Sequence, residues 1–199
     1  FDPDPPTAEA ARAYGAVPLT TVEAFLAADL DAAVVATPNR HHADLSVALL
    51  EKGVPVLVDS RYALTKYRRL TACAPNESEV EQALGVRIDD NPRVLERAGR
   101  RLLERTKMQA VVVTRGSRGM AVFESGRPTV HIPIFGSDQV ADVTGAGDTV
   151  MAALTLTLAA GGTVEQAARL ANIAGGLVVM KRGTATVAAA ELVRAIRRA

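Results

Sequence analysis

One short segment constrains this chain more than any other. Residues 142–148 (Asp-Val-Thr-Gly-Ala-Gly-Asp) run directly into a long apolar stretch of helical character. Gly145, Ala146 and Gly147 carry little or no side chain, so their backbone N–H groups can approach a ligand closely. The first N–H groups of a helix lack partners inside the helix, and the helix dipole is positive there. The segment therefore predicts an anion site at the start of a helix over residues 145–160.

Asp148 gives this site a second property, because a carboxylate beside a bound anion is repelled unless it has a proton to remove. Phosphoryl transfer would use both groups. The N–H groups stabilise the charge that develops on the phosphoryl group, and the carboxylate accepts the proton of the attacking hydroxyl. The alternative is that Asp148 only caps the helix and that the glycines only make a tight turn. The residues alone leave both interpretations open.

Apolar runs alternate with helical segments along the rest of the chain. Buried strands are expected at residues 32–36, 54–58 and 110–114, and residues 120–124 and 129–132 flank a turn signature that predicts a hairpin. The expected helices cover residues 7–14, 21–28, 42–52, 76–84, 92–105, 145–160, 164–181 and 187 onward. Thr163 and Gln166 have the spacing of a capping box. The pattern predicts an α/β fold of three layers around a mainly parallel sheet.

Charge and cysteine content exclude several partners. The net charge is +1, from 23 basic and 22 acidic residues, so neither nucleic acid nor an anionic membrane is expected. The longest apolar stretch, residues 151–160, is far shorter than the ~20 residues that a membrane span needs. Cys73 is the single cysteine, which excludes an intrachain disulfide and favours the cytoplasm. The chain opens without Met and in the middle of a motif, so we expect a fragment.

Residues 142–148 closely resemble the carboxy-terminal signature of the ribokinase-like (PfkB) carbohydrate kinases, and the resemblance extends over residues 54–199. It implies a ribokinase-like sandwich that binds ATP with Mg²⁺ and phosphorylates a hydroxyl of a small sugar or sugar phosphate. In that family the backbone of the Gly-Ala-Gly segment forms the anion hole and the final Asp is the base. The residues assigned by this match are Gly145, Ala146, Gly147 and Asp148, with Asp142 and Thr144 at the nucleotide.

Further motifs are similar to the same family. Asn76 and Glu79 match its Asn-x-x-Glu motif, which orders magnesium and phosphates; the alternative is that Asn76 caps a helix. Residues 114–119 (Thr-Arg-Gly-Ser-Arg-Gly) resemble its Thr-x-Gly-x-x-Gly turn near the nucleotide, or could be a simple turn. Asn172 matches an adenine-pocket position, or is a surface residue. The nucleotide-binding residues implied by these matches are Thr114, Gly116, Gly119, Asn172, Gly183 and Thr184.

The front of the chain resembles a different family. Residues 1–53 are similar to part of the dinucleotide-binding domain of Gfo/Idh/MocA oxidoreductases, as in residues 30–39 (Leu-Asp-Ala-Ala-Val-Val-Ala-Thr-Pro-Asn). The resemblance implies a Rossmann-like β-α-β piece joined to a kinase region over residues 54–199, in an engineered chimera, a natural fusion or a fragment. NAD chemistry is not expected, because the Gly-x-Gly-x-x-Gly phosphate cradle is not in the chain.

Within the kinase family, the resemblance points to the heptose-phosphate kinase domain, on residues 58–62, 71–77, 142–144 and 181–187. The family's sugar-binding half and lid are not in the chain, so turnover by the chain alone is expected to be weak or absent. A second copy or a partner chain would then supply the missing half. Two alternatives stay open, namely a non-catalytic nucleotide-binding or structural module and an NAD-dependent oxidoreductase fragment.

Overall fold

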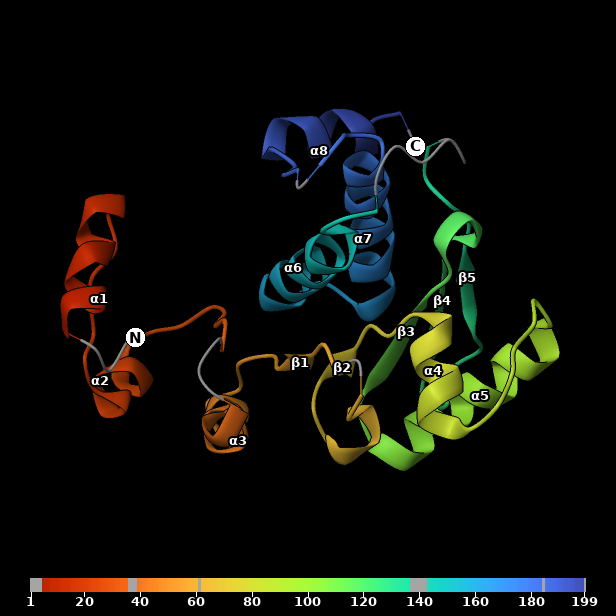
Figure 1. Cartoon of the computed structure of the whole chain (residues 1–199), viewed down its shortest axis with the longest axis horizontal. Coiled ribbons are helices and arrows are strands. Elements are labelled where there is room, and N and C mark those ends of the chain that lie inside the picture. Colours follow the sequence, from red (N-terminus) through yellow and green to blue (C-terminus); the bar gives the residue numbers. More distant parts are fainter. Residues whose placement is uncertain (1–4, 36–38, 61, 137–142, 184, 199) are drawn as a thin grey trace. The chain divides into compact units, whose positions relative to one another are not determined.

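A computed structural model describes residues 5–35, 39–60, 62–136, 143–183 and 185–198 (Figure 1). The chain divides into two compact units, Phe1–Val54 and Pro55–Ala199. This division falls beside the predicted boundary between residues 53 and 54, although the family origin assigned to the first segment stays a prediction. None of the helices in the described ranges has the length and apolar character that crossing a bilayer requires.

The first unit contains short helices. They are α1 (Pro5–Ala10), η1 (Ala11–Tyr14), α2 (Val22–Ala27), η2 (Asn39–His41) and α3 (His42–Glu51). The hydroxyl of Thr21 accepts a hydrogen bond from the N–H of Ala24 at 3.1 Å, which caps α2. The strand predicted over residues 32–36 is wrong for the four positions that the structure describes, since residues 32–35 form no strand and Val34 is 91% exposed. Residue 36 lies outside the described ranges.

The predicted Rossmann-like β-α-β piece is therefore not formed by the described residues. A short apolar run becomes a buried strand only where neighbouring strands take up its backbone hydrogen bonds and a helix covers its side chains. Val34 is exposed instead. After α3 in the sequence, the second strand of the expected unit is reduced from residues 54–58 to Leu57–Val58.

The second unit is built on a five-stranded sheet in the order β1-β2-β3-β4-β5. The strands are β1 (Leu57–Val58), β2 (Ala72–Cys73), β3 (Ala110–Thr114), β4 (Met120–Glu124) and β5 (Val130–Ile132). The pairs β1–β2 and β2–β3 are parallel, whereas β3–β4 and β4–β5 are antiparallel. The sheet is thus mixed rather than mainly parallel, because the short links after β3 and β4 cannot make the crossover that a parallel pair needs. The predicted hairpin is confirmed as β4 and β5.

Helices cover both faces of this sheet, which gives the predicted three layers (Figure 1). They are α4 (Glu77–Leu84), α5 (Pro92–Thr106), α6 (Ala146–Ala159), α7 (Val164–Val179) and α8 (Ala189–Ile196), with the short η3 (Leu64–Lys66) and η4 (Gly116–Arg118) between strands. Helices α4 and α5 contact the sheet on one face, α7 contacts it on the other, and α6 and α8 pack on α7.

Alternating side chains of the strands fill the two interfaces between the sheet and its helix layers. Val112 of β3 and Val122 of β4 share a buried cluster with Leu154 of α6 and with the small residues of α7. Their neighbour Phe123 points to the opposite face and is fully buried there. Burying a side chain of this size is worth about 1.5–3 kcal/mol. A side-chain carbon at Gly99 of α5 would overlap the Phe123 ring, so glycine at that position lets the helix approach the sheet.

Candidate functional site

The start of α6 has the geometry that the glycine-rich segment predicts. Gly145 is its N-cap residue, with φ 77° in the left-handed region that favours glycine. The N–H of Ala146 donates to the Val143 carbonyl at 3.2 Å, and both the N–H and the hydroxyl of Thr149 donate to the Gly145 carbonyl at 3.0 Å. The turn is therefore fixed by its own backbone and by Thr149.

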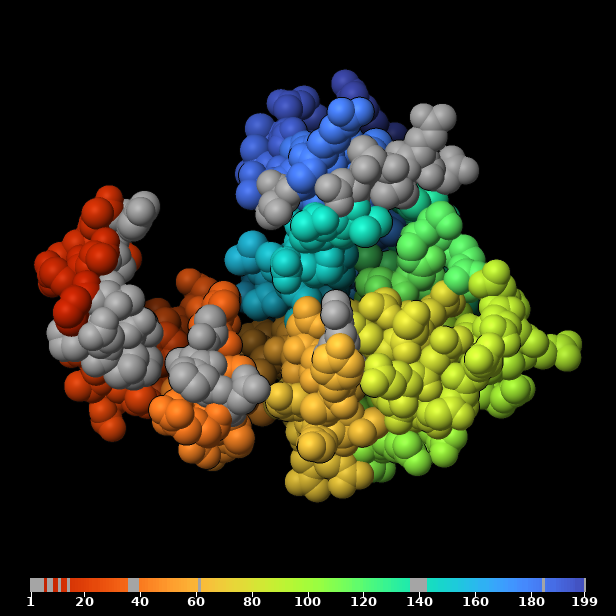
Figure 2. Space-filling model, in the orientation of Figure 1, coloured from red at the N-terminus to blue at the C-terminus, as the bar shows by residue number. Residues whose placement is uncertain are grey.

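No side chain among the described residues caps this helix start. Gly147 and Asp148 are exposed, and a side-chain carbon at Gly147 would meet no atom within 4 Å. The helix is anchored through Val150 and Leu154, whose side chains are 5% and 1% exposed. The first turn of α6 thus presents a positive helix end and a carboxylate to open space, in a segment that reaches the surface of the second unit (Figure 2).

The start of α4 has a different construction. The Asn76 side chain accepts a hydrogen bond from the N–H of Glu79 at 2.9 Å, and the Glu79 carboxylate accepts one from the N–H of Asn76, also at 2.9 Å. These two bonds form a complete capping box. The capping alternative for Asn76 is therefore correct. The predicted magnesium role of Asn76 and Glu79 would have to coexist with the cap.

The predicted turn after β3 lies beside this cap. Asn76 forms an isolated parallel bridge with Thr114, whose N–H donates to the Pro75 carbonyl at 2.9 Å. Gly116 has φ 55°, is exposed, and has open space where a side chain would stand. Gly119 is different, because it is buried and a side-chain carbon there would overlap the Ile132 carbonyl. Backbone conformation accounts for glycine at 116, whereas both backbone conformation and packing account for it at 119.

Pairing across the sheet brings most of the predicted residues to one edge. Thr114 pairs with Met120, which pairs with Ile132, so the bridge of Asn76 to Thr114 continues a single row. Asn172 of α7 joins this edge by donating from its amide to the carbonyl of Pro133, at 2.8 Å. This edge is the carboxyl end of β2, β3 and β5, where ligands of open α/β sheets usually bind.

The start of α6 adjoins the same edge through α7. A side-chain carbon at Gly175 would lie 3.1 Å from Val150, so α6 and α7 approach closely one helical turn from Asn172. Asn172 itself is only 8% exposed, so the alternative that it is a surface residue is wrong. Its hydrogen bond to Pro133 gives it a structural role besides the predicted contact with adenine.

The remaining nucleotide-site predictions are less constrained. Thr144 is exposed just before the α6 turn, and Gly183 is exposed with φ 70° after α7. Asp142 and Thr184 lie outside the described residues. Within the described ranges, no group of three or more His, Cys, Asp or Glu side chains could hold a metal ion. Burial raises the pKa of the Cys73 thiol to about 12, which excludes it as a nucleophile at neutral pH.

Sequence reasoning missed one ionic cluster at this edge. The Glu77 carboxylate accepts a hydrogen bond from the Arg115 guanidinium at 2.9 Å and forms a second ion pair with Arg118. Arg118 also pairs with Asp90. Glu77 is 38 residues from Arg115 and 41 residues from Arg118 in the sequence, so no local pattern joins them. The available signal was the presence of two arginines in the turn and of an acid inside the Asn-x-x-Glu motif.

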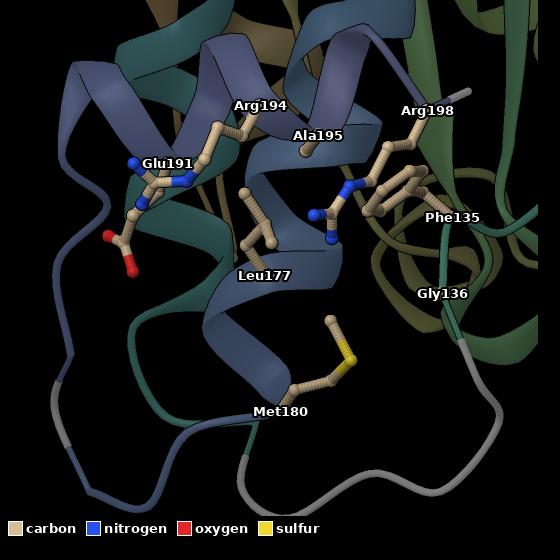
Figure 3. A pocket seen from close by; sticks show the side chains of 8 residues that line it. All are labelled: Phe135, Gly136, Leu177, Met180, Glu191, Arg194, Ala195 and Arg198. Atoms are coloured by element: carbon tan, nitrogen blue, oxygen red, sulfur yellow. The ribbon is translucent and has the colours of Figure 1, made fainter.

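A cavity of about 340 Å³ opens between α7, α8 and the segment after β5 (Figure 3). Leu177, Met180 and Phe135 give it apolar walls, and Arg194 of α8 and Arg198, which follows that helix, extend along it. None of the predicted site residues that the structure describes is among its lining residues. The cavity is therefore a separate feature from the sheet edge and the start of α6.

Comparison with known structures defines the class of protein. The chain is similar to Arabidopsis thaliana ribokinase complexed with ribose and ATP, with a TM-score of 0.70 and 25% identity, over 80% of this chain and 53% of that one. It is also similar in fold to phosphofructokinase-2 from Escherichia coli in complex with substrates and products, with a TM-score of 0.69 and 20% identity, over 84% and 54%. The α/β fold is ribokinase-like, as predicted.

The family follows from the sequence match. The model of the pfkB family of carbohydrate kinases matches residues 18–191, and this chain belongs to that family. Bifunctional protein HldE of Geobacter sulfurreducens is 46% identical over 146 residues, which are 72% of this chain and 29% of the relative. Its counterpart from Klebsiella pneumoniae subsp. pneumoniae is 44% identical over 148 residues, 74% and 30%. The chain thus spans about 30% of the length of these curated relatives.

The family match also bears on the front of the chain. It begins at residue 18, inside the segment that resembles the Gfo/Idh/MocA oxidoreductases. These relatives give no support to a dinucleotide-binding origin for that segment. The absence of the predicted strand at residues 32–35 agrees with this.

Proposed function

We propose that this chain provides the nucleotide-binding and catalytic side of a carbohydrate kinase. The phosphates of ATP bind at the start of α6, over Gly145–Gly147, and Asp148 is the base. One observation carries the proposal: α6 begins on a left-handed glycine without a side-chain cap among the described residues, and an exposed carboxylate lies in its first turn.

The start of α6 suits the negative charge of a phosphate group. The positive end of α6 favours an anion, and glycine at position 147 leaves the space beside the backbone open. When bound, ATP supplies the phosphoryl group that is transferred. The N–H groups of the first turn donate to phosphoryl oxygens, and because the turn is already fixed by Thr149, little reorganisation is needed during the reaction.

Asp148 has the position that a general base requires. It is the third residue of α6, so its carboxylate lies beside the same N–H groups, and its exposure leaves room for a hydroxyl to approach. Proton removal by a positioned carboxylate contributes ~10²–10⁴-fold to a rate. A purely capping role would leave this carboxylate without an effect on turnover.

Magnesium fits this edge through a mixed set of ligands. One oxygen of Glu79 accepts the Asn76 N–H, and the carboxylate has a second oxygen that could reach the ion through water. Mg²⁺ usually keeps several waters and takes one or two carboxylates with the substrate phosphates. Asn76 and Glu79 would therefore orient hydrated magnesium without giving up the helix cap.

The acceptor is the hydroxyl of a sugar or sugar phosphate, and the resemblance of residues 58–62, 71–77, 142–144 and 181–187 to the heptose-phosphate kinase domain favours a heptose phosphate. The chain covers 53% of the matched ribokinase structure. We infer that the chain alone binds ATP with magnesium but transfers the phosphoryl group weakly. Full turnover would then need the remaining half of the sugar site, from a second copy or from a partner.

Two measurements test the proposal on the chain itself. Isothermal calorimetry should detect binding of ATP with Mg²⁺ to the wild type and to Asp148→Asn alike. Release of ADP in the presence of a heptose phosphate should be slow but measurable in the wild type and should fall by ~10²–10⁴, to background, in Asp148→Asn. The matched control is Asp44→Asn, an exposed acid in the first turn of α3, which should change neither quantity. Absence of binding by the wild type, or equal turnover by Asp148→Asn, would refute the proposal.

A further inference from the structure

The cluster around Glu77 connects the start of α4 to the turn between β3 and β4. Glu77 is the first residue of α4, directly after Asn76. One of its carboxylate oxygens accepts from Nε of Arg115 at 2.9 Å, and the other pairs with Nη2 of Arg118. The two arginines are at either end of the Gly116–Arg118 turn. A single carboxylate therefore binds both ends of the turn that is expected to approach the nucleotide.

Burial makes this contact different from an ordinary surface ion pair. The side chains of Glu77 and Arg115 are only 15% and 12% exposed. A largely buried charge that loses its partner is strongly destabilised, so the carboxylate and the guanidinium keep each other in place. Asp90 also pairs with Arg118, but its side chain is 76% exposed and adds a weaker restraint.

We propose that Glu77 is a positioning residue for nucleotide binding, an inference that rests on the proposed function. It holds Arg115 and Arg118 so that the exposed backbone of Gly116 is presented at the sheet edge beside Asn76. Gly116 has φ 55°, in the left-handed region that favours glycine, and its backbone is open because no atom lies within 4 Å of where a side-chain carbon would stand. In this role the two arginines are structural supports, or struts, that hold the turn in place. Glu77, and not the phosphates of the nucleotide, neutralises their charge.

This assignment predicts the sign of an effect. If the arginines were themselves phosphate ligands, neutralising Glu77 would free them and ATP would bind more tightly. If they are struts, neutralising Glu77 releases the turn and ATP binds less tightly. The affinity of one variant separates the two roles.

The experiment is a calorimetric titration of the chain with ATP and Mg²⁺. Glu77→Gln should raise the dissociation constant about tenfold, the effect of losing a charge-assisted hydrogen bond at the site. Asp90→Asn is the matched control and should change it less than about twofold, since the exposed pair adds little. In an Arg115→Gln background, Glu77→Gln should have a clearly smaller effect on affinity, which a general loss of stability would not produce.

The outcomes separate this inference from the proposed function. A wild type that does not bind ATP refutes the proposed function. A wild type that binds, with Glu77→Gln binding equally well or more tightly, overturns the role of Glu77 alone. Should Glu77→Gln fail to fold, Glu77→Asp keeps the charge but shortens the reach of the carboxylate to Arg115 and Arg118. That variant should also bind ATP less tightly, and unchanged affinity would equally overturn the inference.

Discussion

Helices α4 and α6 both begin at the carboxyl edge of the sheet, and their first turns are built in opposite ways. At α4, Asn76 and Glu79 exchange two hydrogen bonds of 2.9 Å, so the helix start is closed by its own side chains. At α6, the cap residue is Gly145, which has no side chain to offer, and the described residues provide no other cap. An asparagine cap typically contributes ~1 kcal/mol, which α6 forgoes.

The difference separates stability from binding. A closed helix start uses its N–H groups to hold the fold, whereas an open one leaves them available to an anion from solution. The open start is also the one with Asp148 in its first turn and with open space beside Gly147. The two helix starts together therefore distinguish a structural element from a ligand-binding element at one edge of one sheet.

The largest expected effect on this comparison comes from closing α6. Gly147→Ala should stabilise the helix by roughly 0.5–1 kcal/mol, because alanine loses less backbone entropy than glycine. The added methyl group enters the space in which a phosphate would lie, so affinity for ATP should fall by about tenfold or more. Thermal unfolding and calorimetry on the same variant measure the two effects.

Opposite signs are the diagnostic result for this variant. If the first turn of α6 has only a structural role, the substitution should change stability and affinity for ATP in the same direction, or leave the affinity unchanged. A higher unfolding temperature with unchanged or improved affinity for ATP would show that the start of α6 is not part of the nucleotide site. A joint fall of stability and affinity would show that Gly147 is needed for packing.

A smaller effect is expected from opening α4. Asn76→Ala removes the side chain that accepts the Glu79 N–H and should cost about 1 kcal/mol of the free energy of unfolding. Thr163→Ala is the matched control, because Thr163 and Gln166 form the same box at α7, with hydrogen bonds of 3.2 and 2.8 Å. Denaturant unfolding should show similar losses for both variants.

Affinity for ATP with Mg²⁺ then separates the two caps. Only Asn76→Ala should weaken it, because Asn76 lies beside Thr114 at the sheet edge. Equal affinities of the two variants would leave Asn76 with a capping role alone. A magnesium titration at fixed ATP shows whether the loss, where present, concerns the ion.

Local patterns in the sequence predicted the parts of this comparison that depend on neighbouring residues. The capping box of Thr163 and Gln166, the hairpin of β4 and β5 and the helix that begins after Gly145 all formed as expected. Each depends on residues a few positions apart, so the sequence contains the whole physical cause. The strand expected at residues 32–36 failed because a strand also needs distant partners, which the sequence does not specify.

For the candidate site as well, the sequence predicted local features but not contacts between distant residues. Resemblance to a family located the first turn of α6 and the turn after β3, but it did not distinguish Gly119, which packing requires, from Gly116, which packing does not. Nor did it reveal the contact of Glu77 with Arg115 over 38 residues of sequence. Asn172 was assigned to the nucleotide, and its hydrogen bond to Pro133 could not be inferred without the tertiary structure.

A third helix start, at α8, provides the smallest test of the comparison. The Glu191 carboxylate accepts a hydrogen bond from the backbone N–H of Ala188 at 2.9 Å and another from the Lys181 ammonium at 3.1 Å, so a side chain closes this end as well. The hydrogen bond from the Ala188 backbone, followed by the one from Lys181, lowers the pKa of Glu191. A carboxyl whose pKa is lower in the folded state contributes stability above its unfolded pKa, and that contribution disappears as pH falls through the folded value.

Glu191→Gln should therefore lower the unfolding temperature slightly at about pH 7, and the difference from wild type should shrink towards about pH 3, below the ordinary glutamate range. Because the carboxylate is exposed, we expect a shift of only about one or two degrees. Lys181→Met is the control for the cause. It removes the second contribution but leaves the Ala188 hydrogen bond, so part of the pH dependence should survive. If the unfolding temperatures of Glu191→Gln and wild type differ by the same amount at both pH values, the carboxylate does not close α8. The contrast between closed and open helix starts would then rest on α4 and α6 alone.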